Sequence, residues 1–307
     1  MCRRATRLLV SVLAAMLVWA VAFPAVAADD EPDPLANVTV HPDSRSTKVK
    51  SALLSVWRGV RDYADHHGLS SLPRFDLYIH DSKDDAAAAV RDWDWDVFDG
   101  LARSGSAHVL VGEWGLATEV VAHEAFHIVQ FEVMGHDDPK HACLSEGGAE
   151  WFGRRHRSGT LDWDRDVADA AEPFTDERPD WERLDRLDEF QDAVRADDVD
   201  VYTFCFVVFD LLERVHGRGA YFDFLKLLGS KDWRAAFEEA FSEPPSEFSE
   251  RLDVWFESGF TDWTTAADRR RAEEAAEAAR QQRLRLRELL DRRVYSCNPA
   301  LAAGCIL

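Results

Sequence analysis

Residues 121–127 of this chain read Val-Ala-His-Glu-Ala-Phe-His, a His-Glu-x-x-His run with apolar neighbours on both sides. Such a run is predicted to lie on a buried helix. Residues four apart on a helix lie about 40° apart on one face, so the imidazoles of His123 and His127 can bind one metal ion. Glu124 lies about 100° from His123, where its carboxylate can face a water on that metal.

A second run with the same kind of chemistry occupies residues 144–151, which read Leu-Ser-Glu-Gly-Gly-Ala-Glu-Trp. Eighteen residues separate His127 from Glu146, which is enough chain to turn around and begin a second helix. Glu146 is therefore the candidate third ligand, and two imidazoles with one carboxylate suit zinc and leave a fourth position open. Glu150, four residues further on, is placed to accept a hydrogen bond from a ligating histidine.

Together the two runs resemble the gluzincins, the thermolysin-like zinc metallopeptidases. The spacing of 18 residues is that of the aminopeptidase-N-like branch, whereas the Glu-Gly-x-Ala-Glu-aromatic motif is similar to the motif of several secreted bacterial peptidases of the same clan. The resemblance covers residues 77–256 in order of elements, but only the two runs match closely. It implies that His123, His127 and Glu146 bind Zn²⁺, that Glu124 is the general base, and that Glu150 orients His123.

The resemblance also implies a fold and an oxyanion donor. The expected fold is α+β and zincin-like with two lobes: a small N-terminal sheet with helices, the active-site helix, and a mainly helical C-terminal lobe. The strand before the metal helix, residues 108–112, would form a wall of the cleft with a free edge for substrate, or else be an ordinary core strand. Tyr202 is the candidate oxyanion donor, with His216 as its rival and plain packing as the alternative.

The first 27 residues are predicted to be a signal peptide. Arg3, Arg4 and Arg7 precede the apolar run 8–23, and Ala-Val-Ala at 25–27 forms a small-x-small cleavage site. The alternative is an uncleaved membrane anchor, which would need about 20 apolar residues and no cleavage site. No later stretch of the sequence is long and apolar enough to span a bilayer. The product is therefore expected to be secreted, either extracellular or associated with the cell wall, with no stable membrane span after cleavage.

Export changes the interpretation of the cysteines. Cys2 would leave with the leader, and the remaining four allow three pairings in an oxidising compartment. We favour a Cys143–Cys205 disulfide bond, which would hold the third ligand against the first two, and a Cys297–Cys305 bond. Free buried thiols are the alternative.

The net charge of −21 excludes nucleic acid and anionic membranes as partners bound through the overall field. The expected partner is a peptide or protein substrate, and the oligomeric state is left open by the sequence.

Hydrophobic periodicity and capping residues give the order of elements. We expect helices at 48–67, 84–97, 118–134, 181–187, 201–216, 221–228, 233–241, 245–256 and 264–293, and strands at 75–79 and 107–111. Thr118 would cap the metal helix and Gly135 would end it. The expected division is a signal peptide at 1–27, an α/β lobe at 28–135, a helical lobe at 136–262, and a charged helix with a disulfide-closed tail at 263–307.

These patterns predict a secreted zinc metallopeptidase, a hydrolase in which Glu124 activates water on the metal. No Gly-x-Met-Glu-Asn run precedes His123, so an endopeptidase is favoured over an aminopeptidase. The alternative is a non-catalytic secreted zinc-binding protein that acts through partner binding at the cell surface. Glu124 argues against that alternative, because a purely structural site does not use a base beside the metal.

Overall fold

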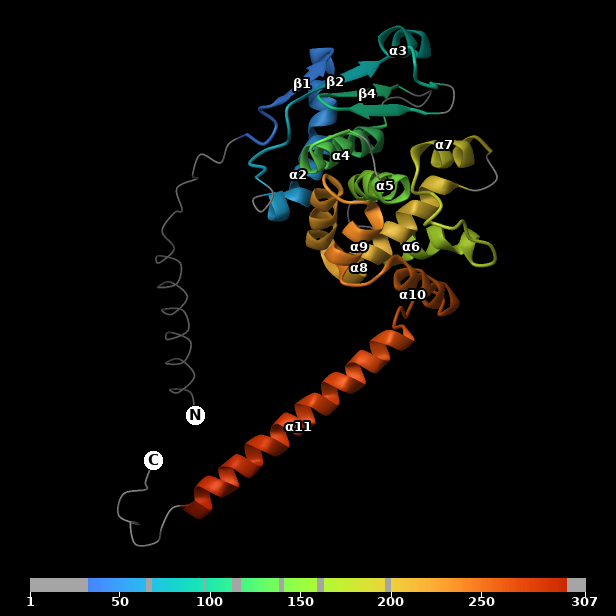
Figure 1. The fold of residues 1–307 in the computed structure, drawn as a ribbon. Coiled ribbons are helices and arrows are strands. Elements are labelled where there is room, and N and C mark those ends of the chain that lie inside the picture. Colours follow the sequence, from blue (N-terminus) through green and yellow to red (C-terminus); the bar gives the residue numbers. More distant parts are fainter. Residues whose placement is uncertain are drawn as a thin grey trace, which may run out of the picture.

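The computed structural model describes residues 33–64, 68–95, 98–111, 117–137, 141–158, 163–196 and 200–296. The predicted signal peptide and the predicted Cys297–Cys305 bond lie outside these residues. The described chain is a mixed α+β structure, with a small sheet at one end, helices beneath it, and one long helix that projects from the body (Figure 1). No helix in the described ranges has the length and apolar character needed to cross a membrane.

The sheet contains four strands in the order β1 (Val38–His41), β2 (Phe75–His80), β4 (Ser106–Leu110) and β3 (Gly100–Arg103). The first three are parallel, and β3 is antiparallel to β4. The two predicted strands are confirmed to within one residue. The strands β1 and β3 were not predicted, because four residues are too few to show an alternating pattern.

The strand expected to offer a free edge does not do so. β4 lies between β2 and β3 and is paired on both sides, so of the two alternatives for this strand the ordinary core strand is confirmed and the free substrate-pairing edge is wrong. The edge strand on this side is β3, which packs against the metal helix α4 (Thr118–Met134). A two-stranded antiparallel unit before α4 therefore replaces the single strand that the sequence indicated.

The two faces of the sheet are covered differently because successive strand residues face opposite sides. Leu77 and Val109 join the main core with α2 (Ser46–Ala64) and α4. The outer face carries a smaller cluster around Trp95, packed under α3 (Lys83–Ala89). The predicted helix 84–97 is therefore too long: the chain leaves α3 at Val90 and turns so that Trp95 covers the sheet and donates to the Val90 carbonyl.

The metal helix α4 is buried along most of its length, as its continuous apolar sequence predicts. Gly135 ends it in the left-handed conformation, with φ of 77°, as expected. The residue at the N-cap is Ala117, which has no side-chain cap, so the predicted capping role of Thr118 is wrong.

Close packing fixes the second ligand-bearing helix, α5 (Ala142–Ser158), between α4 and α8 (Val201–Leu228). A Cβ atom at Gly147 would collide with the backbone carbonyl of Cys205, so only glycine permits this approach. The predicted Cys143–Cys205 disulfide bond is confirmed and joins the same two helices. Glu146 is thus held at a defined distance from α4.

One short 3-10 helix, Asp43–Arg45, lies in the N-terminal part. The elements after α5 are all helical, as predicted for that part of the chain. They are the 3-10 helix Glu172–Phe174 and the α-helices α6 (Trp163–Ala171), α7 (Leu187–Ala196), α9 (Trp233–Phe241), α10 (Pro245–Glu257) and α11 (Ala266–Ser296).

Two predicted helices in this part of the chain differ from the structure. Residues 181–187 form turns up to Arg186, because Trp181 and Leu184 are buried by folding inward from an irregular segment. At Gly217 the backbone has φ of 77° and ψ of 159°, which breaks the helical geometry as predicted, but the chain continues within α8 beyond the kink.

Candidate metal centre

The side chains of His123, His127 and Glu146 converge at one point between α4 and α5. The two histidine Nε2 atoms lie 3.1 Å apart, and Glu146 Oε2 lies 3.2 Å from His123 Nε2 and 3.3 Å from His127 Nε2. Donor atoms bonded tetrahedrally to zinc at about 2.0–2.1 Å would be roughly 3.3 Å apart. The sequence-predicted ligands therefore have the spacing of a metal site, and they form a candidate metal-binding group in the described part of the chain.

Gln130 fixes which nitrogen of His127 faces this point. The Gln130 amide nitrogen donates to the Ser145 carbonyl and to the Tyr221 hydroxyl, both at 2.9 Å, so its oxygen must be the atom that faces His127. That oxygen accepts from Ser145 Oγ at 2.9 Å and lies 2.7 Å from His127 Nδ1. Since the amide oxygen can only accept, His127 Nδ1 carries the proton, and its Nε2 presents a lone pair to the triad.

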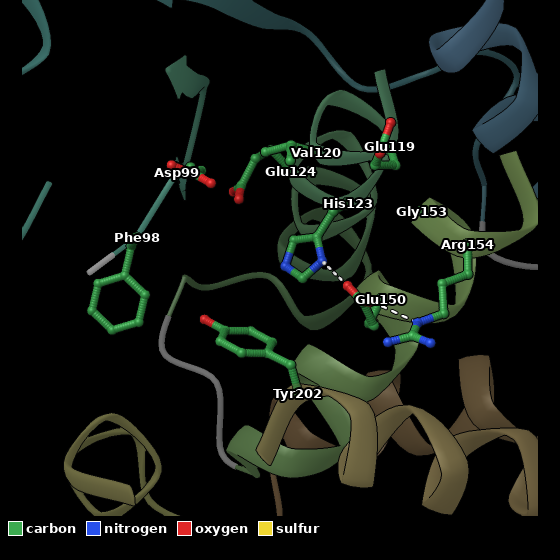
Figure 2. A pocket seen from close by; sticks show the side chains of 11 residues that line it. Phe98, Asp99, Glu119, Val120, His123, Glu124, Glu150, Gly153, Arg154 and Tyr202 are labelled. Atoms are coloured by element: carbon green, nitrogen blue, oxygen red, sulfur yellow. Dashed lines mark hydrogen bonds and ion pairs between the residues drawn. The ribbon is translucent and has the colours of Figure 1, made fainter. Parts of the chain in front are cut away.

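Glu150 lies beside the other ring nitrogen of His123. Its Oε2 atom lies 3.5 Å from His123 Nδ1, as shown in Figure 2, and its Oε1 accepts from Arg154 Nε at 2.7 Å. Arg154 also donates to Thr203 Oγ1 at 2.6 Å. Burial would raise the pKa of Glu150, but the hydrogen bonds to His123 and Arg154 lower it to about 2. The expected orientation of His123 by Glu150 thus has a geometric basis.

Two histidine nitrogens and a carboxylate oxygen consequently meet in a buried space, where atoms left without a proton or a cation between them are costly. Burial disfavours a charge on His123, yet hydrogen bonds to Glu146 and Glu150 raise its pKa to about 10. Burial opposes ionisation of Glu146 as well, but the two histidines lower the pKa of its carboxyl group. A proton or a metal ion can satisfy this arrangement, and the two compete for the same position.

Glu124 stands beside the triad without a partner. Its side chain is 5 % exposed, and no residue of the described ranges forms a hydrogen bond or ion pair with its carboxylate. The carboxylate abuts Gly100 of β3, where a Cβ atom would collide with it. Burial raises the pKa of Glu124, and the nearby histidines oppose this only in part. A buried carboxylate that is free to accept a proton is the property expected of a general base.

Two cavities adjoin these residues. The larger, about 250 Å³, is lined by His123, Glu124 and Tyr202 together with residues of β3 and α5. The smaller, about 100 Å³, is lined by the three predicted metal ligands and reaches along β3 to Ala102. In Figure 2 the Glu124 carboxylate points across the larger cavity toward Asp99. A bound molecule could therefore reach the triad and Glu124 together.

Tyr202 lies in both cavities, at the start of α8. Its ring centroid is 6.1 Å from that of His123, and its ring packs edge-on against Phe190. Burial, together with the nearby carboxylates of Glu146 and Glu124, raises the pKa of Tyr202 well above its usual value. The hydroxyl therefore stays protonated at neutral pH and can donate a hydrogen bond into the cavity.

The rival donor, His216, lies elsewhere. Its Nε2 atom is 2.6 Å from Glu243 Oε1, its ring packs on Phe241, and it lines neither cavity. The structure therefore brings Tyr202, and not His216, to the candidate metal centre.

Other histidines near the centre have structural roles. His141 follows a loop-like, polar stretch of sequence, yet it is 1 % exposed, lies against Trp181 and Trp233, and accepts from the Leu144 amide at the start of α5. Burial lowers the pKa of His141 to about 3. His108 stacks on the outer face of the sheet, where burial lowers its pKa to about 4.

Sequence reasoning missed several residues that support the centre. Gln130 could have been found, because it follows His127 by three positions on the same helix and an amide is uncommon on a buried apolar face. Gly100, Arg154 and Tyr221 carry no such signal, since their roles depend on elements that meet only in the folded chain.

Comparisons with protein-family models, with curated proteins and with solved structures gave no match.

Proposed function

We propose that this protein is a secreted, zinc-dependent metallopeptidase with a zincin-like, two-lobed arrangement of the sheet-bearing and helical parts. The observation that carries the proposal is the convergence of His123, His127 and Glu146, with lone pairs directed inward, beside the buried and unpaired Glu124. Such a triad requires a cation, and such a carboxylate has no evident use in a purely structural site.

The donor set fits zinc. Two imidazole nitrogens and one carboxylate oxygen are a common ligand set for catalytic zinc, and three protein ligands leave a coordination position open. When bound there, zinc would supply Lewis-acid chemistry, by lowering the pKa of a water molecule to about 7 and polarising a carbonyl group. Gln130 and Glu150 hold the two imidazoles in the tautomers that ligation requires.

The residues around the triad have distinct proposed roles. Glu124 takes a proton from the attacking water and delivers it to the leaving amine, and burial, which raises its pKa, favours the first of these transfers. Tyr202, which stays protonated, donates a hydrogen bond to the carbonyl oxygen as negative charge develops on it. Gly100 leaves room for the Glu124 carboxylate beside β3.

The substrate proposed is an extended peptide. Strand β3 has one edge paired with β4, and its residues Gly100, Leu101 and Ala102 line the smaller cavity along the triad. A peptide can add to the other edge by main-chain hydrogen bonds, which would carry a peptide bond past Glu124. This arrangement favours an endopeptidase, as does the missing Gly-x-Met-Glu-Asn run.

Secretion is proposed from two independent features. The leader at 1–27 has the charge and apolar pattern of an export signal, and the Cys143–Cys205 bond joins the helix that carries Glu146 to α8. A disulfide bond at that position is expected to persist only in an oxidising compartment.

Replacing Glu124 by Gln tests the proposal directly. The variant should keep its bound zinc, because Glu124 is not a ligand, and should lose turnover by about 10²–10⁴-fold, the usual contribution of a general base. Zinc would be measured by elemental mass spectrometry, and turnover with a mixed library of quenched fluorescent peptides, with and without a chelator. Glu132→Gln, on an exposed turn of the same helix, is the matched control. Protein purified without zinc, or unchanged turnover in Glu124→Gln, would refute the proposal.

A further inference from the structure

The larger cavity beside the triad combines acidic and apolar lining residues. Its charged lining residues, apart from the proposed base Glu124, are Asp99, Glu119, Glu150 and Arg154. Its large apolar lining side chains are Phe98, Val120 and the ring of Tyr202. The cavity shares His123 and Glu124 with the smaller one, so a group bound in it lies next to the triad. The charges in its wall therefore bear on which substrates can reach Glu124.

Two of the carboxylates in this wall have no cation paired with them. The guanidinium group of Arg154 is engaged by Glu150 at 2.7 Å and by Thr203 at 2.6 Å. Figure 2 shows Arg154 on the side of the cavity away from Asp99. No lysine or arginine of the described ranges forms an ion pair with Asp99 or Glu119.

The other basic groups in this neighbourhood are engaged or uncharged. Arg195 lies over the ring of Phe98 at 5.9 Å, but it is shared between two aspartates outside the cavity, both at 3.5 Å. His156 lies close enough to Glu119 to be affected by its charge, yet burial lowers the pKa of His156, which is therefore neutral at pH 7. Neither group neutralises the cavity wall.

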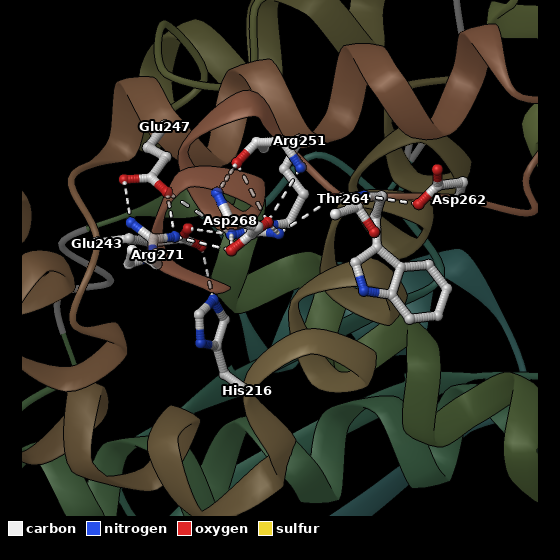
Figure 3. A network of polar contacts seen from close by, with 10 residues as sticks. His216, Glu243, Glu247, Arg251, Asp262, Thr264, Asp268 and Arg271 are labelled. Atoms are coloured by element: carbon white, nitrogen blue, oxygen red, sulfur yellow. Dashed lines mark hydrogen bonds and ion pairs between the residues drawn. The ribbon is translucent and has the colours of Figure 1, made fainter. Parts of the chain in front are cut away.

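The ion-pair network at the base of α11 shows how this chain neutralises carboxylates elsewhere. There Arg251 donates to Glu243 at 2.7 Å, and Arg271 donates to Glu247 at 2.6 Å (Figure 3). Asp268 accepts from both arginines. A concave wall of one charge sign without such partners raises the local concentration of ligands of the opposite sign. The cavity is thus suited to a cationic ligand.

The chemistry of the wall favours a long basic side chain over a metal ion. Asp99 and Glu119 belong to no group of three ligand atoms in the described ranges that could share one ion. A lysine or arginine side chain can instead lay its aliphatic stem on apolar surface while its charged end reaches a carboxylate. Phe98 and Val120 supply apolar surface in the same cavity.

We propose that the larger cavity binds the side chain of a lysine or arginine next to the cleaved bond, and that Asp99, supported by Glu119, sets this specificity. The inference rests on the proposed peptidase function, which supplies the peptide. Asp99 directly precedes β3, the strand along which the peptide is proposed to lie, and the Glu124 carboxylate points toward it (Figure 2). A basic residue beside the cleaved bond brings its charge to Asp99 while its main chain lies at the triad.

The test uses N-acetylated, quenched fluorescent peptides that differ only at one of the two positions flanking the cleaved bond. Arginine, lysine, citrulline or glutamate occupies that position, and mass spectrometry of the products identifies the bond that is cut. The zinc-loaded wild-type chain should cleave the arginine peptide with a kcat/KM about tenfold or more above that of the citrulline peptide, which has nearly the same shape but no charge.

Substitutions at Asp99 should change this ratio in a defined order. Asp99→Asn should narrow the ratio severalfold, and Asp99→Lys should reverse the preference so that the glutamate peptide is cleaved faster than the arginine peptide. Asp84→Asn removes an exposed carboxylate on α3, outside the cavity, and is the matched control that should keep the wild-type ratio. The wild-type comparison decides the matter if a variant does not fold.

Affinity provides a second measurement that needs no turnover. Isothermal titration calorimetry with the zinc-loaded Glu124→Gln variant should show the arginine peptide bound about tenfold more tightly than the citrulline peptide. A chain that hydrolyses none of the peptides would contradict the peptidase function, and the affinities would still decide whether the cavity binds a basic side chain. Cleavage of both peptides with equal kcat/KM and equal affinity would overturn the inference and leave the peptidase function in place. A preference seen only with a free N-terminal amine would overturn it too, because the recognised cation would then be the N-terminus.

Discussion

Histidine and carboxylate side chains gather in two parts of this molecule, and the two clusters are built differently. At the base of α11, His216 contacts Glu243, and Arg251 supplies a permanent positive charge to Glu243 and Asp268. At the candidate metal centre, Glu146 faces two histidines, and no lysine or arginine of the described residues pairs with it. Arg154 is nearby but is engaged by Glu150.

The difference shows what a cluster of this kind requires. Buried carboxylates need a compensating cation, which a network built for structure contains within the chain. Where no lysine or arginine of the described residues supplies that charge and two histidines face the carboxylate, a proton on a histidine or a bound metal ion can supply it. This contrast explains why His216, although it lies in a helix next to the metal helix, is a structural residue and not a candidate for catalysis.

The largest expected effect comes from removing one histidine from each cluster. His127→Ala should abolish stoichiometric zinc binding and with it hydrolysis, because two ligands do not hold the ion against solvent. His216→Ala, the matched control, should keep its zinc and its activity, since Arg251 still neutralises Glu243. Elemental analysis and peptide turnover of both variants provide the measurement. Equal zinc loss in the two variants would remove the distinction between the clusters.

A smaller effect is expected at Gln130, which the contrast identifies as part of the metal centre. Gln130→Leu should weaken zinc affinity by about 10–100-fold, because the ring of His127 loses the acceptor that fixes its tautomer. Gln130→Glu keeps an acceptor at that position and should restore most of the affinity. Competition with a chromogenic chelator would measure both. If Gln130→Leu and Gln130→Glu bind zinc equally well, the amide does not position His127.

The smallest effect concerns a histidine that belongs to neither cluster. His141 is buried, and burial together with the nearby charge of Arg234 lowers its pKa to about 3 in the folded chain from an ordinary 6.5. The unfolded chain therefore binds a proton in the interval between these values and the folded chain does not, so stability is lost as the pH falls below 6.5. Between pH 7 and pH 5.5 this loss should be about 1 kcal/mol.

Urea unfolding at the two pH values would measure that loss. His141→Asn keeps an acceptor at the start of α5 but does not titrate, so its stability should fall less than that of the wild-type chain over the same interval. An identical fall in both proteins would show that His141 is not the titrating group.

Much of the candidate metal centre could be predicted because its residues lie only a few positions apart in the sequence. A spacing of four residues places His123 and His127 on one helical face, and Gly135 marks the end of that helix through its backbone freedom. The same local rules failed where burial decided the conformation. Trp181 and Leu184 suggest a helix by their spacing, yet their side chains are buried by turns. Likewise His141 resembles a solvated loop residue until Trp181 and Trp233 enclose it.

By itself the sequence determined which side chains can bind a metal, which carboxylate stands next to them, and which cysteines can tie α5 to α8, because helical periodicity and side-chain chemistry are local properties. Only the tertiary structure decided that β3 and not β4 is the edge beside the centre, that Gly100 makes room for Glu124, and that Tyr202 and not His216 reaches the cavity. Those outcomes depend on contacts between segments far apart in the chain, which form when packing brings apolar faces together and leaves particular polar atoms without water.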